Sequence, residues 1–107
     1  MFCGCTSLIT AQAALPATTL KNYCYSNMFS GCTSLTTAPS ISATTLALSC
    51  CENMFSGCSS LIVAPSLPTI SLKQSCYSYM FRDCTSLITA PSLPATSLST
   101  YCYRSMF

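Results

Sequence analysis

The dipeptide Met-Phe recurs along this chain with a spacing of 26 residues, or 27 in the first copy, and this repeat constrains the fold more than any other feature. Self-similarity at such a period is typical of solenoids, in which each unit buries its apolar face against its neighbours. We therefore expect a single domain made of one array. Its units are residues 1–27, 28–53, 54–79 and 80–105, with the start of a fifth unit at 106–107.

Several columns of the repeat keep one type of apolar residue in each unit. A Phe, a Cys and a Leu follow one another at fixed places, and a second Cys column lies near the end of the unit. We expect these columns to face inward and to form the core. The core predicted in this way is Phe29, Phe55, Phe81, Cys32, Cys58, Cys84, Leu35, Leu61, Leu87, Cys50, Cys76 and Cys102.

Two segments of each unit carry different local patterns. Apolar residues at i, i+4 and i+8, as in Leu98, Cys102 and Met106, form one face of two helical turns. The segment SLIVAPSLP has β-branched residues and then Pro, which suit a short strand. We expect each of about four units to be a short extended strand plus a short helical turn, and the fold to be an α/β solenoid. A left-handed residue would close each helix in the column that holds Gly4, Gly31, Gly57 and Asp83.

The recurring string MFxGCxSL resembles the bacterial BspA-like leucine-rich repeats. In this chain it stands as MFSGCTSL, MFSGCSSL and MFRDCTSL, and the resemblance covers all units. It implies a right-handed, leucine-rich-repeat-like coil in an extracellular or cell-surface bacterial protein, with a role in adhesion to host proteins or to other cells. The chain departs from the family where aliphatic residues would alternate in the strand, since it has Ala38-Pro39, Ala64-Pro65 and Ala90-Pro91 there.

The charged and catalytic residue types are too few for several classes of function. A net charge of +2 with 6% charged residues is sparse for a surface that follows phosphates, so we expect no nucleic-acid partner. No apolar run approaches the roughly 20 residues that span a bilayer. The chain has no His, the usual base at neutral pH, and its two carboxylates, Glu52 and Asp83, occupy different phases of different units. We expect no enzyme and no cofactor.

Ten cysteines fall into two columns of four, plus Cys3 and Cys51. One interpretation makes the column cysteines small buried hydrophobes that fill a tight place in every unit. The other makes them disulfides, for which a pair such as Cys24 and Cys32 has better geometry than neighbours in one column, whose side chains point the same way. Metal binding is not expected, because the chain lacks His and a CxxC pair.

Two sets of side chains are candidates for the outer surface. Ser and Thr columns suit turns and solvated strand faces, and they could also carry O-linked sugars. An ice-binding lattice is less favoured, because Thr6 and Thr10 are four residues apart where a Thr-x-Thr pattern would be needed. A second candidate is the column of Tyr25, Tyr77 and Tyr103, either as a packed aromatic ladder or as an adhesive patch for a host protein or glycan.

The ends of the array carry no polar capping unit, although a solenoid needs one to cover its last core columns. Head-to-tail stacking of copies through Met1, Phe2, Met106 and Phe107 would cover them and produce a filament. Flanking sequence would also cover these last core columns. Stabilisation of the uncovered ends by a crystal or by design is a third explanation. We predict a structural and interaction module of an extracellular bacterial surface protein that assembles end to end. The alternative is an adhesin-type module that binds a host protein or glycan.

Overall fold

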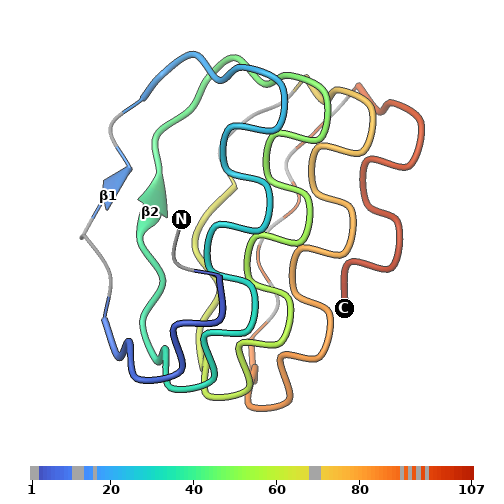
Figure 1. Ribbon diagram of the computed structural model, residues 1–107. Helices are drawn as coiled ribbons and strands as arrows, with labels where there is room; N and C mark the ends of the chain where they lie inside the picture. Colours follow the sequence, from blue (N-terminus) through green and yellow to red (C-terminus); the bar gives the residue numbers. More distant parts are fainter. Residues whose placement is uncertain are drawn as a thin grey trace.

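Backbone hydrogen bonds between successive units determine the architecture of this computed structural model, which describes residues 3–10, 14–15, 17–67, 71–89, 91, 93, 95 and 97–107. The N–H of Tyr25 donates to the carbonyl of Cys50 at 2.8 Å, and the N–H of Cys51 donates to the carbonyl of Cys76 at 3.0 Å. Equivalent residues of neighbouring units therefore lie next to each other. Figure 1 shows the result as a row of zigzag segments of the chain that lie side by side.

Each zigzag is a run of four-residue turns, at residues 22–31, 48–57, 74–83 and 100–105. Within a run, every second N–H donates to the carbonyl three residues earlier, as from Ser26 to Tyr23 at 3.1 Å and from Ser30 to Asn27 at 3.2 Å. The N–H groups between them donate to the next unit. Every fourth residue is left-handed, with φ of 59° at Tyr23, 57° at Asn27 and 75° at Gly31. The chain thus reverses direction at regular intervals.

The prediction of an α/β solenoid is wrong, and so are the helical turn and the leucine-rich-repeat-like coil that belong to it. The described residues contain no helix, and their strands are β1 (Ala14–Leu15) and β2 (Ser40–Ile41). These two short strands pair in parallel, with Leu15 opposite Ile41. The misinterpretation has a physical cause, because apolar residues at i, i+4 and i+8 fit a run of four-residue turns as well as a helix.

The extended side of each unit meets its neighbour at single residues. Parallel bridges join Thr10 to Thr37, Thr37 to Val63 and Val63 to Thr89, and further bridges join Thr19 to Thr45 and Ser71 to Ser97. Pro residues follow soon after the first of these columns and lack an N–H, so they cannot continue a ladder of hydrogen bonds. The extended segments are thus held in register without forming a wide sheet.

The core lies between the turns and the extended segments. Most of the predicted core residues are buried there, and Cys84 and Leu87 are partly buried. Phe29, Phe55 and Phe81 form a column of stacked rings, with centroids 5.4 Å and 5.8 Å apart and planes within 2° of parallel. Among the described residues no helix is long and apolar enough to cross a membrane.

Candidate interaction surfaces

The tyrosine column proposed as a binding face lies mostly inside the molecule. Tyr77 has an exposed fraction of 0%, and Tyr25 and Tyr103 are half-buried against the core. The rings of Tyr77 and Tyr103 stack with centroids 6.1 Å apart. Burial raises the pKa of the Tyr25 and Tyr103 hydroxyls above the ordinary value. Tyr77 and Tyr103 thus pack as an aromatic pair, whereas Cys51 stands between Tyr25 and Tyr77 in this column, and only Tyr25 and Tyr103 are partly accessible to a partner.

Other tyrosines, which the repeat columns did not single out, face the solvent. The side chains of Tyr23 and Tyr101 are 57% and 56% exposed, and Tyr79 is half-buried. All three occupy left-handed positions of the turns, with φ between 56° and 59°. The sequence signal for this surface was a spacing in steps of four residues along the turn side, in phase with the Gly column, which marks the left-handed positions.

Two arginines lie against these exposed rings. The Arg104 guanidinium carbon is 5.0 Å from the ring centroid of Tyr101 and 5.7 Å from that of Tyr79. The Arg82 guanidinium carbon is also 5.7 Å from the Tyr79 centroid. A cation at this distance from a ring is attracted by the negative face of its π system. We refer to Tyr79, Arg82, Tyr101 and Arg104 as the Arg–Tyr cluster.

The Arg–Tyr cluster concentrates charge in a chain that has little of it. It holds two of the four basic residues, and Asp83 lies beside it with its Oδ2 atom 3.6 Å from Arg82 Nε. Both side chains of this ion pair are well exposed, at 59% and 73%. Two arginines and one aspartate leave the area with one net positive charge. The geometry suits recognition of an anion next to an aromatic surface.

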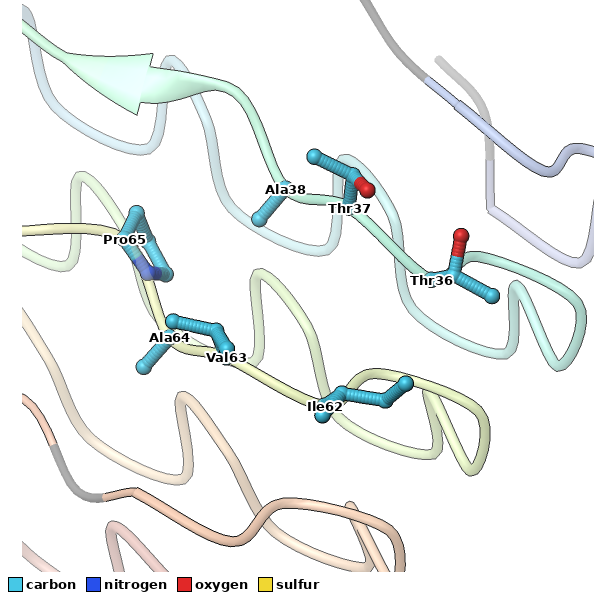
Figure 2. A pocket seen from close by; sticks show the side chains of 7 residues that line it. All are labelled: Thr36, Thr37, Ala38, Ile62, Val63, Ala64 and Pro65. Carbon is cyan, nitrogen blue, oxygen red and sulfur yellow. The ribbon is translucent and has the colours of Figure 1, made fainter.

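A shallow hollow of about 450 Å³ lies on the extended side, between two neighbouring segments. Figure 2 shows the side chains that line it, which are apolar apart from two threonine hydroxyls. Ile62 and Val63 remain 44% and 57% exposed at its rim. The lining contains no titratable group, so the hollow offers apolar contact and no acid–base chemistry. Its residues are Thr36, Thr37, Ala38, Ile62, Val63, Ala64 and Pro65.

The cysteines are thiols and not disulfides, including the candidate pair Cys24 and Cys32. Cys58 Sγ donates to the Phe29 carbonyl at 3.1 Å, and Cys84 Sγ donates to the Phe55 carbonyl at the same distance. Burial raises the pKa of Cys58 to about 12 and that of Cys84 to about 11. Both thiols therefore stay protonated and weakly nucleophilic at neutral pH.

The second thiol column is not uniform, because a side-chain hydrogen bond with Cys51 lowers the pKa of Cys50. Burial raises the pKa of Cys76 to about 12, and Cys50 and Cys51 have no exposed surface. Cys3, Cys5 and Cys24 are exposed. In the part of the chain that the structure describes, no three His, Cys, Asp or Glu residues are placed to hold a metal ion.

The predicted end-to-end contact is described at one end only. Met106 is buried, whereas Phe107 is 58% exposed and stacks on Phe81 with centroids 5.9 Å apart. Beside this last ring is a hollow of about 200 Å³, which Phe81, Asp83, Cys84, Thr85, Leu87 and Phe107 line. Met1 and Phe2, the predicted contacts at the other end, lie outside the described residues.

Comparison with known proteins gives no match to a family model, to a curated protein or to a solved structure. The resemblance of MFxGCxSL to BspA-like repeats therefore stays a prediction. The physical properties of the surfaces described above carry the functional conclusions.

Proposed function

We propose that this chain is a structural and interaction module that associates end to end, and that it is not an enzyme. The observation that carries this proposal is the column of phenylalanine rings. Its spacing stays between 5.4 Å and 5.9 Å from Phe29 to Phe107, and the last ring remains 58% exposed. A ring from a second copy could extend the column by the same contact that already joins its members.

The contact between units explains why such stacking would be favourable. Phe55 donates its backbone N–H to Met80 at 3.0 Å, and Phe81 donates to Met106 at 2.8 Å, while their rings stack. Each added unit thus satisfies backbone groups and buries apolar surface at the same time. Burial of the exposed part of Phe107 and of the hollow beside it would add to the gain. With so few charged residues, little electrostatic repulsion opposes association.

The surfaces support a module without catalysis. The larger hollow has no titratable group in its lining, and the buried thiols of Cys58 and Cys76 have pKa values of about 12. A thiol must ionise to act as a nucleophile, and these thiols ionise far above neutral pH. We also propose an extracellular bacterial surface as the place of action, a proposal that rests on the resemblance of the repeat string.

Sedimentation velocity and electron microscopy over a concentration series test end-to-end association. We expect the average mass to rise with concentration and elongated particles to appear. Phe107→Asp should shift the population towards monomer, because it places a charge at the end of the ring column. Val63→Asp is the matched control, since Val63 is 57% exposed, lies outside that column and has a neighbouring unit on both sides. A wild-type chain that stays monomeric at all concentrations, or equal effects of the two variants, would overturn the proposal.

A second candidate function, a binding module for another molecule, is favoured by the Arg–Tyr cluster. The cluster brings together exposed tyrosine rings and arginine side chains. Tyrosine and arginine are among the residue types that contribute most to binding energy at interfaces. The cluster lies on the turn side, where Arg104 contacts the ring of Tyr79 in the preceding unit.

A further inference from the structure

We propose that the Arg–Tyr cluster binds an acidic oligosaccharide, that is, a sugar chain that bears carboxylate or sulfate groups. The proposal deepens the binding-module function and rests on it. In this arrangement the guanidinium groups of Arg82 and Arg104 pair with the acidic groups. The exposed ring of Tyr101 packs against the apolar face of a sugar ring.

Aromatic rings hold the two guanidinium groups of the cluster. Both lie 5.7 Å from the same ring, that of Tyr79, and Arg104 also lies 5.0 Å from Tyr101. Arginine loses rotational freedom when it binds, and side chains already held on aromatic rings lose less. The planar fork of N–H donors matches a carboxylate or sulfate in geometry.

The positive charges of the two arginines are available to a ligand. In the described part of the chain, Arg104 forms no ion pair, and Arg82 forms one exposed pair with Asp83. An exposed pair of this kind contributes little stability, so an incoming anion can replace or share it at small cost. Two arginines are far fewer than the phosphate contacts of nucleic-acid-binding proteins, so a short acidic ligand fits better than a polynucleotide.

The surface around the arginines favours a sugar over an acidic peptide. Left-handed positions of adjoining turns carry hydroxyl and amide groups at Ser75, Asn53 and Ser105. These groups are uncharged donors and acceptors, which suit the hydroxyls of a sugar. Tyr101, which is 56% exposed, adds a flat ring with a polar tip.

Titration calorimetry with three probes tests the proposal. The probes are oligogalacturonate for carboxylates, a dextran sulfate oligosaccharide for sulfates, and neutral dextran of similar length. We expect saturable binding of at least one acidic probe, weakened by added salt, and no binding of neutral dextran. The acidic probe that binds identifies the preferred group.

Paired variants locate the site. Arg82→Gln with Arg104→Gln should weaken binding of the acidic probe at least tenfold, and Tyr101→Ala should weaken it severalfold. Lys21→Gln with Lys73→Gln removes the same charge elsewhere and should have less than a threefold effect. Circular dichroism verifies that each variant keeps its fold. Equal losses in the two double variants would overturn the proposal, because they would show attraction to net charge alone.

A polyglutamate peptide separates failure of this proposal from failure of the binding-module function. If the peptide binds through Arg82 and Arg104 while both acidic sugars do not, the cluster is an interaction site for protein and the sugar proposal is wrong. If none of the acidic probes binds, both the sugar proposal and the binding-module function lose their support. Self-association of the same variants, measured by sedimentation, reports separately on the end-to-end contact.

Discussion

The rings of Phe29 and Phe55 lie face to face, with 5.4 Å between their centroids and 2° between their planes. The backbone enforces this relationship, because Phe29 N–H donates to the Met54 carbonyl at 2.9 Å and Phe55 N–H donates to the Met80 carbonyl at 3.0 Å. Equivalent residues of adjacent units therefore share one place in the core. A column of identical side chains follows directly from this register.

Truncation of the central ring should be costly. We expect Phe55→Ala to lower the free energy of unfolding by about 3–5 kcal/mol, because it removes a fully buried ring that contacts rings on both sides. Urea denaturation measures the change. Ile88→Ala, at a side chain that is 79% exposed, should change it by less than about 0.5 kcal/mol. A similar small loss in both variants would contradict the stacked core.

The glycine column should depend on backbone conformation and not on space. A Cβ at Gly57 would lie 3.6 Å from the Gly31 Cα, an ordinary contact, but φ is +76°. We expect Gly57→Ala to lower the free energy of unfolding by about 1–2 kcal/mol, the cost of a left-handed L-residue. Gly57→Asn should cost less than half as much, since Asn tolerates this region better and Asp83 adopts φ 59° at the equivalent place. Equal losses in the two variants, measured by urea denaturation, would indicate crowding instead.

Stability should fall in alkaline solution because of the buried thiols. The pKa of Cys58 and of Cys76 is about 12 in the folded chain, above the ordinary value of 9.0. Above pH 9 the unfolded chain has released these protons and the folded chain still holds them. The free energy of unfolding is thus unaffected by these thiols below about pH 8 and decreases from pH 9 towards pH 12. The slope is roughly 1.4 kcal/mol per pH unit for each thiol.

Urea denaturation between pH 8 and pH 10 measures this decrease. The double variant Cys58→Ala with Cys76→Ala should show a shallower dependence on pH than the wild type, whatever its stability at pH 8. The same slope in both proteins would mean that these thiols do not cause the effect.

Two tyrosines should differ in how much stability their truncation costs. Tyr77 is fully buried and stacked on Tyr103, so Tyr77→Ala should lower the free energy of unfolding by about 3–5 kcal/mol. Tyr23 is 57% exposed, and Tyr23→Ala should lower it by less than about 1 kcal/mol. Thermal unfolding followed by circular dichroism compares them. A larger loss of stability for Tyr23→Ala than for Tyr77→Ala would mean that Tyr23, and not Tyr77, packs in the core.

Periodicity alone could not distinguish a helix from a run of turns. Leu98, Cys102 and Met106 are spaced as on a helix, yet Leu98 is 65% exposed while Cys102 and Met106 are buried. The distinguishing signal was the residue at every fourth place on the turn side, such as Asn27 and Gly31, which adopts a positive φ. A helix would not accept a left-handed residue at each turn.

The surfaces were harder to predict than the core, because they depend on contacts between units. The regularity of the Tyr25, Tyr77 and Tyr103 column reflects packing around the core. Arg104 approaches Tyr79 from the next unit. This contact depends on the register between segments 25 residues apart in the sequence. The Tyr79 N–H establishes that register by donating to the Arg104 carbonyl at 2.8 Å. Neither residue belongs to a constant column, so the repeat did not reveal the cluster.

The sequence by itself determined which residues are equivalent and which types must be alike, because side chains at one place in every unit have one set of neighbours. Only the tertiary structure decided how each unit is folded. Hydrogen bonds between units compete with those of a helix for the same N–H groups. Here Tyr25, Asn27 and Phe29 donate to the next unit, and the residues between them close turns within their own. That alternation replaces the helix and brings Tyr79, Tyr101 and the two arginines to one surface.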